Sequence, residues 1–239
     1  QAVVGIRPAN ATVSLPLLDL AFHRVCLEGL PRFSAEGQIP SGPLCESAPR
    51  TGGAWGCDEQ RTGDWLQVVQ SLSSRDVLAL GLLLTDMFAF TLRGWNHKQQ
   101  TERIADLLPG FVAFLKTLRC KVVWISHPAY HDLQHSAFLA GTASYELWDG
   151  SLQRHLTSHV FDPVISSASA TMVAAGIDVL DAHTMTLARP DLSPDGIHYS
   201  INKDTLESAE QGTIVSLEIS RMLVTLLSFS SEAPSGDNT

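Results

Sequence analysis

The stretch Asp76-Val77-Leu78-Ala79-Leu80-Gly81-Leu82-Leu83-Leu84 decides the fold class, because every residue after Asp76 is apolar or glycine. A strand with one solvent-facing side alternates apolar and polar residues, whereas an unbroken apolar run indicates a strand that is buried on both faces. Such strands belong to parallel sheets that carry helices on both sides. The run therefore predicts a central strand of an α/β protein.

Two further strands are predicted on the C-terminal side of this run. The first is Lys121–Ser126, which ends at His127-Pro128, and the second is Ile177–Asp181. Helical patterns separate the strands and cover residues 65–72, 101–118 and 163–175. Pro109-Gly110 predicts a kink in the second helix, and Gly176 is typical of a C-cap. Strands that alternate with helices predict a mainly parallel sheet between helices, with reactive groups at the carboxyl ends of the strands.

The remaining segments extend this pattern into one domain over residues 1–227. They are, in chain order, a short buried strand over 2–6, a helix over 15–27, an irregular insertion at about 31–64 and a last helix over 206–227. The insertion is rich in Gly, Pro and Ser, and irregular segments of that length are often functional. Residues 228–239 are polar, and we expect them to be a disordered tail.

The composition excludes several classes of partner. The chain has 239 residues, of which 44% are hydrophobic and 17% charged, as is typical of a globular domain with a substantial core. The formal net charge of −9 and the pI near 5.4 argue against nucleic acid or an anionic membrane as the main partner. No apolar run reaches the roughly 18 residues that a membrane span needs, so we expect no direct membrane span.

Two features of the sequence favour the secretory pathway or the extracellular space. Cys45 and Cys57 lie in the Gly/Pro/Ser-rich insertion, where a disulfide would staple a loop. Asn10-Ala11-Thr12 is a candidate N-glycosylation site. Since four cysteines in the whole chain also suit a reduced protein, the cysteines alone do not decide the compartment.

The tetrapeptide Asp195-Gly196-Ile197-His198 carries the clearest chemical signal. An aspartate that holds one ring nitrogen of a histidine fixes its tautomer, and the other nitrogen can then take a proton from a hydroxyl. The alternative interpretation is an Asx-type turn after Pro194, with His198 packed against Tyr199 and the last helix. The sequence leaves both open.

The passage Gly176-Ile-Asp-Val-Leu-Asp-Ala, together with residues 194–199 (Pro-Asp-Gly-Ile-His-Tyr), resembles the closing block of the SGNH (GDSL-like) hydrolases. It is most similar to the PC-esterase branch, which includes the plant trichome-birefringence-like polysaccharide O-acetyltransferases. Asp64-Trp65 and the strands that begin at Asp76 and Lys121 follow in the family's order, so the resemblance covers about residues 64–227. It implies a three-layer α/β/α sandwich that hydrolyses or transfers acyl esters, with no cofactor and no metal.

The resemblance also implies roles for individual residues. His198 is similar to the general base, and Asp195 to the acid that orients it. The family's nucleophile is the serine of a Gly-Asp-Ser motif, which this chain lacks. The nearest candidate is Ser14, which precedes the helix predicted over 15–27 and is equally suited to cap it.

The oxyanion side of the site is also changed relative to the family. The chain has Gly81-Leu-Leu-Leu-Thr85-Asp86 where the family has a glycine followed by asparagine or by aromatic residues. Gly81 is the candidate N–H donor, and Thr85, Asp86 and His127 are candidate substrate-side residues. One missing donor of this kind costs about 3 kcal/mol of transition-state stabilisation.

Three histidines, His127, His131 and His135, follow one another at four-residue spacing, with Asp132 beside them. On a helix this spacing would gather three metal ligands on one face. Because Pro128 interrupts a helix at that point, we expect no metal site and interpret the histidines as loop residues near the substrate.

Two functions remain open on the sequence alone. The first is an enzyme that hydrolyses or transfers an acyl group, most simply acetyl, on a glycan or another acylated small molecule, with Ser14 as nucleophile. The second is a catalytically inactive relative that serves as a structural or binding subunit among other protein subunits of a glycoprotein assembly. The missing Gly-Asp-Ser favours the second function, and the intact Asp-x-x-His favours the first.

Overall fold

The computed structural model of the chain describes the parts that form a four-stranded sheet, helices α1, α3, α6 and α7, and the 3₁₀ helix η3. The described residues are 4–5, 27, 30–41, 59–83, 86–87, 90–91, 94–133, 157–193, 195–197, 199, 218, 221–222 and 225. The helix predicted over 15–27 and the tail over 228–239 lie almost wholly outside these residues. Of the predicted last helix, only Glu218, Arg221, Met222 and Thr225 are described, and all four are helical.

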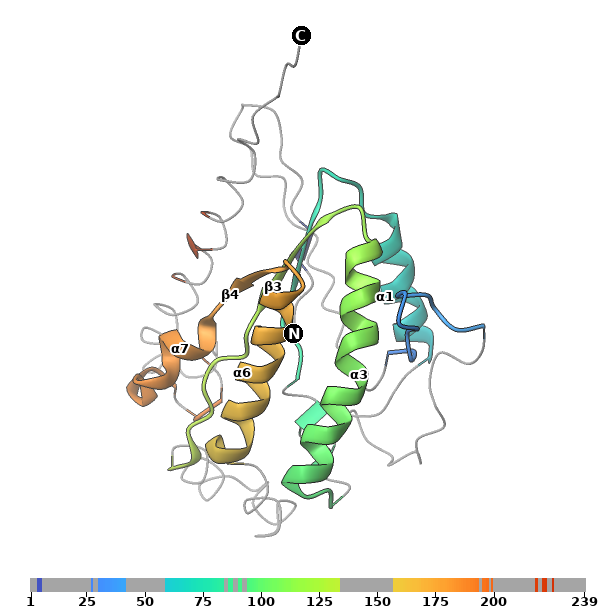
Figure 1. The fold of residues 1–239 in the computed structure, drawn as a ribbon. Helices are drawn as coiled ribbons and strands as arrows, with labels where there is room; N and C mark the ends of the chain where they lie inside the picture. Colours follow the sequence, from blue (N-terminus) through green and yellow to red (C-terminus); the bar gives the residue numbers. More distant parts are fainter. Residues whose placement is uncertain are drawn as a thin grey trace.

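The chain is an α/β protein, as the sequence predicts (Figure 1). Its elements are β1 (Val4–Gly5), α1 (Glu59–Ser71), β2 (Val77–Leu80), α3 (His97–Thr117), β3 (Lys121–Ile125), α6 (Ser158–Ala174), β4 (Asp178–Leu180), α7 (Ala182–Leu187) and the 3₁₀ helix η3 (Pro190–Leu192).

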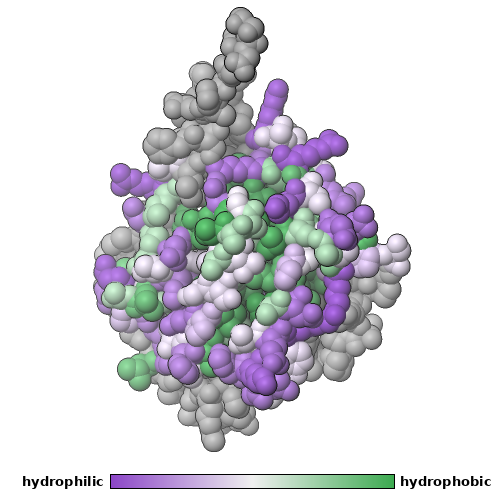
Figure 2. All heavy atoms as spheres, in the orientation of Figure 1, coloured by the Kyte–Doolittle hydropathy of each residue, from purple (hydrophilic) through white to green (hydrophobic). Residues whose placement is uncertain are grey.

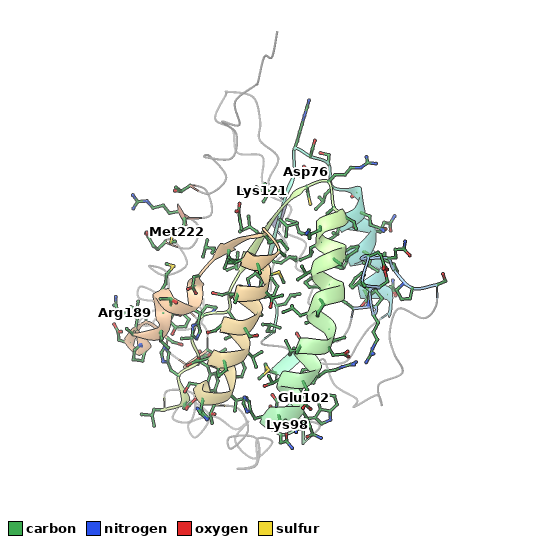
Figure 3. All side chains as sticks on the ribbon, viewed as in Figure 1. Asp76, Lys98, Glu102, Lys121, Arg189 and Met222 are labelled. Atoms are coloured by element: carbon green, nitrogen blue, oxygen red, sulfur yellow. The ribbon has the colours of Figure 1, made fainter. Side chains whose placement is uncertain are left out.

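The described sheet has the order β1-β2-β3-β4. Strands β2, β3 and β4 are mutually parallel, and their registers pair Ala79 with Val123 and Trp124 with Val179. This confirms the parallel arrangement predicted for the three main strands. β1 pairs antiparallel with β2, so the short N-terminal strand is an antiparallel edge of the sheet. Lys121 binds Asp178 at 2.8 Å across the amino ends of β3 and β4, and Figure 3 labels Lys121 beside Asp76 at this end.

Side chains alternate between the two faces of the sheet, as the pleat requires. On one face, Leu78, Leu80 and Trp124 join the main core cluster. On the other face, Ala79, Val123 and Leu180 join a separate cluster with Ala182 and Met185 of α7. The central side chains of both faces are at most 1% exposed. Both faces are therefore buried, which explains the unbroken apolar run of β2.

Helices α1, α3 and α6 cover the first of these faces. Figure 1 shows α3 and α6 side by side in front of β3, and Figure 2, in the same view, shows apolar side chains between polar ones on this surface. The helices contribute large buried side chains to the main core, among them Trp65, Phe111, Phe161 and Met172. Among the described residues, no helix is both long and apolar enough to cross a membrane.

The ends of the helices follow the expected capping rules. Asn96 accepts from the N–H of Gln99, and the side chain of Gln99 accepts from the N–H of Asn96, so a capping box begins α3. Gly176 has a φ of 79° after α6, and the N–H of Ile177 donates to the carbonyl of Met172 at 3.0 Å. This is a Schellman end, and it confirms the C-cap predicted at Gly176.

Residues 30–41 are irregular, as predicted, and they pack closely on α3. Phe33 stacks on Phe114 with ring centroids 4.3 Å apart. A Cβ on Gly37 would lie 2.5 Å from the backbone of Ala113, and one on Gly110 would lie 2.4 Å from the carbonyl oxygen of Phe33. Glycine is therefore required at both contact points.

Several predicted boundaries differ from the structure. Helix α3 begins at His97 instead of residue 101, and α6 begins at Ser158 instead of residue 163. Helix α1 begins at Glu59, inside the range predicted to be irregular, because its first turn is polar and the apolar pattern begins only at Trp65. Strand β2 ends at Leu80, although the apolar run continues to residue 84. The chain leaves the extended conformation there, and Leu83 has a φ of 94°.

Candidate functional site

The carboxyl ends of the three parallel strands lie at one edge of the sheet, here called the carboxyl edge. Gly81 follows β2, Ser126 and His127 follow β3, and Asp181 follows β4. Sites of open α/β proteins form at this edge, because the loops that leave neighbouring strands converge there. The structure thus brings two candidates of the sequence, Gly81 and His127, to the same edge.

The segment after β2 is tightly constrained. An added Cβ at Gly81 would lie 3.4 Å from the carbonyl oxygen of Ile125 in β3. The buried Leu83 adopts its positive φ, and its carbonyl accepts from the N–H of Met87 at 2.9 Å. A non-glycine residue in this region of backbone space is strained, and such strain gathers at functional sites. Asp86 follows, with 0% of its surface exposed, whereas Thr85 lies outside the described residues.

The hydroxyl of Ser126 joins the ends of β3 and β4. The N–H of Ser126 donates to the carbonyl of Leu180 at 3.0 Å and so continues the strand pairing. Its Oγ donates to Asp181 at 3.1 Å and accepts from the N–H of His183 at 2.9 Å. One buried hydroxyl therefore connects the end of β3 to the residue after β4 and to the start of α7.

Asp181 is the N-cap of α7. Its carboxylate accepts from the N–H of Thr184 at 3.0 Å and from the hydroxyl of Thr184 at 2.6 Å. Burial by itself would raise the pKa of Asp181, but the bonds from Thr184 and Ser126 and the nearby His183 lower it below its usual value. The carboxylate is thus kept charged at the start of the helix, where a negative charge is favourable.

An imidazole and a carboxylate that sequence reasoning missed also pair here. The Nε2 atom of His183 lies 2.9 Å from Oδ1 of Asp162, which belongs to the first turns of α6. The side chain of His183 is 8% exposed, and that of Asp162 is 31% exposed. His183 follows a predicted strand closely and could have been noticed in the sequence. No sequence motif around Asp162 indicates that it pairs with His183.

The geometry fixes the tautomer of His127. Its Nδ1 lies 2.6 Å from the carbonyl oxygen of Pro128, and a carbonyl can only accept, so Nδ1 carries the proton. In the neutral ring, Nε2 is then the acceptor. The residue is 8% exposed. This is the tautomer in which an imidazole can take a proton through Nε2.

The loop that contains Asp195 lies against the segment that leaves β3. The N–H of His131 donates to the carbonyl of Gly196 at 2.8 Å, which connects the two. Within the loop, Oδ1 of Asp195 accepts from the N–H of Ile197 at 3.0 Å, and Gly196 has a φ of 77°. The loop is therefore an Asx turn, as the alternative interpretation of the sequence proposed. His198 and Ser14 lie outside the described residues, so their predicted pairing stays a prediction.

Two buried tyrosines lie next to this loop. Burial raises the pKa of Tyr130, and the charges of Asp132 and Asp195 raise it further. Burial also raises the pKa of Tyr199, and the negative charges of Asp191 and Asp195 raise it further. Both phenols are therefore neutral hydrogen-bonding groups over the ordinary pH range.

The described residues contain no group of three or more His, Cys, Asp or Glu side chains that could hold a metal ion. Asp132 serves instead at the start of α6, where it accepts from the N–H of Ser158 at 2.6 Å and from its hydroxyl at 3.1 Å. The Nε2 atom of His131 lies 3.2 Å from the carbonyl oxygen of Thr186. His135 is outside the described residues, so the three-histidine pattern is not placed as a whole.

The predicted disulfide and glycosylation residues are also not placed by the structure. Cys45, Cys57 and Asn10 lie outside the described residues. Cys120 is described, and it is a buried thiol whose pKa is raised mainly by burial.

No model of a known protein family, no curated protein and no solved structure matches the chain significantly. The resemblance to SGNH hydrolases therefore depends on the motif of the sequence.

Proposed function

We propose that the carboxyl edge is an acyl-ester site, at which an acyl group, most simply acetyl, is hydrolysed or transferred on a glycan hydroxyl. The observation that carries the proposal is the bond between His131 and Gly196, at 2.8 Å. It holds the Asp195 loop at the edge where α/β proteins place their reactive groups. The strained Leu83 beside Gly81 and the tautomer of His127 add support at the same edge.

In the proposed reaction, Oγ of Ser14 attacks the carbonyl carbon of the ester while His198 takes the hydroxyl proton. His198 returns this proton to the leaving alcohol, and Asp195 keeps the ring in the required tautomer. Water or an acceptor hydroxyl then attacks the acyl-serine and loses its proton to His198, which passes this proton to Oγ of Ser14 as the bond between the acyl carbon and Oγ breaks. The backbone N–H of Gly81 would stabilise the oxyanion in both steps.

We also propose that the fold is a three-layer α/β/α sandwich of the SGNH type. The support is that the face of the sheet opposite α1, α3 and α6 is buried as well, since Ala79, Val123 and Leu180 are at most 1% exposed. The antiparallel β1 would be an addition at the edge of the sheet.

A secretory or extracellular location is part of the same proposal, supported by Cys45 and Cys57 in a Gly/Pro/Ser-rich segment and by the sequon at Asn10. It predicts that Asn10 carries a glycan and that Cys45 and Cys57 form a disulfide. Treatment of the protein from its natural source with an N-glycosidase, followed by peptide mapping without reduction, would check both. An unmodified Asn10 and two free thiols would contradict this part of the proposal.

Hydrolysis of an aryl acetate is the direct test of the chemistry. We expect turnover by the full chain, and its loss in Ser14→Ala and His198→Asn. Ser166→Ala, which changes an exposed serine of α6, is the matched control and should leave turnover unchanged. Turnover that survives in Ser14→Ala would contradict the assigned nucleophile.

The second candidate is a non-catalytic relative that binds glycan or another protein subunit. The observation that favours it is the Asx turn, in which the carboxylate of Asp195 already has a structural use. Gly81 is also followed by leucines instead of an oxyanion-hole asparagine. No turnover of aryl acetates together with binding of an acetylated oligosaccharide would favour this function over the first.

A further inference from the structure

Thr186 of α7 contacts the segment that leaves β3, and this segment contacts the loop of Asp195. Thr186 is 0% exposed, and its Oγ1 donates to the carbonyl of Ala182 at 2.7 Å. The same oxygen also lies 3.2 Å from the carbonyl oxygen of His183. It accepts from the N–H of Ala129 at 2.8 Å, because a main-chain N–H can only donate. Thr186 therefore donates within α7 and accepts from Ala129.

Ala129 belongs to the exit segment, residues 127–132, which leaves β3 at the carboxyl edge. Ala129 is 0% exposed. If Thr186 lost its hydroxyl, water could not replace the acceptor of the Ala129 N–H, and this donor would be left unsatisfied. Two residues further along the exit segment, the ring of His131 lies 3.2 Å from the carbonyl oxygen of Thr186. Thr186 therefore holds the exit segment through both its side chain and its main chain.

The exit segment in turn holds the Asp195 loop. The N–H of His131 donates to Gly196 at 2.8 Å, and its ring meets Tyr199 edge-on with centroids 6.1 Å apart. The hydroxyl of Tyr199 lies 3.4 Å from the carbonyl oxygen of Ala129 and 3.5 Å from that of Thr186. These last two distances are longer than a good O–H···O hydrogen bond. The contacts of His131 therefore restrain the loop more than those of Tyr199 do.

We propose that Thr186 is a positioning residue that fixes residues 195–197 and Tyr199 through the exit segment. The role of the loop as an acid–base element rests on the proposed function, whereas the connection itself rests on the contacts of Thr186, Ala129 and His131. Thr186 precedes Asp195 by nine residues in the sequence, and it belongs to helix α7 and not to the loop.

The test compares Thr186→Val, which keeps the shape but removes the hydroxyl, with Thr186→Ser, which restores it. Thr171→Val is the matched control, because the hydroxyl of Thr171 makes the same type of helical bond, to the carbonyl of Ser167, without reaching the carboxyl edge. Hydrogen exchange is followed by NMR at the main-chain amides of His131 and Ile197, with Trp124 in β3 as the internal reference. This readout needs no turnover.

In Thr186→Val we expect exchange at His131 and Ile197 to accelerate about tenfold relative to Trp124, as the loss of a buried hydrogen bond allows. Exchange should return to the wild-type rate in Thr186→Ser and stay unchanged in Thr171→Val. Unchanged exchange in Thr186→Val would overturn the proposal, whatever the activity. Should Thr186→Val fail to fold, His131→Leu removes the bond of the ring to the carbonyl of Thr186 and its contact with Tyr199, and keeps the main-chain bond to Gly196. Exchange at Ile197 should then rise about threefold, and an unchanged rate there overturns the proposal too.

Kinetics with an aryl acetate separate this proposal from the proposed function. Positioning predicts that kcat falls about tenfold in Thr186→Val while KM stays within about twofold. A wild-type protein without turnover, but with the expected exchange pattern, contradicts the acyl-ester function and supports the positioning role. Full activity in Thr186→Val with accelerated exchange contradicts a need for positioning.

Discussion

The helix-covered face of the sheet and its carboxyl edge are held together by different forces. On the face, Trp65, Phe111 and Phe161 pack with other apolar side chains, and the stabilisation grows with the apolar area that is buried. At the edge, Ser126 and Thr186 connect segments 55 and 57 residues apart through a few directed hydrogen bonds. A packed core tolerates substitutions that conserve side-chain volume. A hydrogen bond between buried groups depends on one donor and one acceptor, and removal of either leaves the other unsatisfied. The two regions should therefore respond differently to substitution.

The largest effect is expected in the core. Phe111 is 0% exposed, and Phe111→Ala should lower the free energy of unfolding by about 3–5 kcal/mol through lost burial and the cavity left behind. Chemical denaturation monitored by circular dichroism measures it. A loss below about 1 kcal/mol would show that the helix-covered face is not the main source of stability.

The close contact between residues 30–41 and α3 gives the next largest effect. Gly37 has a φ of 77°, and an added Cβ would meet the backbone of Ala113 at 2.5 Å. Gly176 has a φ of 79° with open space around it, so Gly176→Ala is the matched control for the backbone strain alone. We expect Gly37→Ala to cost about 3 kcal/mol and Gly176→Ala about 1 kcal/mol. Equal costs, measured by thermal unfolding, would contradict the close contact.

The pair of His183 and Asp162 tests the directed character of the edge. A double-mutant cycle with His183→Ala and Asp162→Ala should give a coupling energy of about 1.5 kcal/mol, as for a hydrogen bond that involves a charged group. Asp162→Asn keeps an acceptor oxygen and should retain part of the coupling. Additive single substitutions, measured as free energies of unfolding, would mean that the 2.9 Å contact contributes no stability.

The smallest effect concerns the cap of α7. Asp181→Ala should cost about 1 kcal/mol at neutral pH. Because the pKa of Asp181 is lowered in the folded protein, its charged form contributes stability above the unfolded pKa of about 3.9, and this contribution is lost as the pH falls through the folded pKa. The difference between wild type and variant should therefore shrink in acid. Asp181 is well exposed, so solvent screening keeps this charge contribution small.

The difference between the packed face of the sheet and its carboxyl edge also explains which features the sequence could predict. Local patterns of apolar residues and glycine predict the strand within residues 76–84, the helix over 101–118 and the cap at Gly176. They do not predict the exact ends of the strand and the helix. The antiparallel pairing of β1 has no local pattern, because a short strand pairs in either direction.

The candidate site was predictable only in its location. Gly81, His127 and Asp195 all follow strands or lie in the last loop, so the carboxyl edge was expected. The pairing of His183 with Asp162, the role of Thr186 and the strain at Leu83 depend on how distant segments meet. Such contacts are consequences of the tertiary fold, and no spacing in the chain encodes them.

Covalent labelling with a fluorophosphonate tests the central claim, that the carboxyl edge performs acyl transfer, most directly. Intact mass and peptide mapping of the labelled chain should give one adduct, on Ser14, whose rate of formation falls at least about a hundredfold in His198→Ala because the hydroxyl is no longer activated. A chain that stays unlabelled, or that is labelled at the same rate without His198, would contradict the claim.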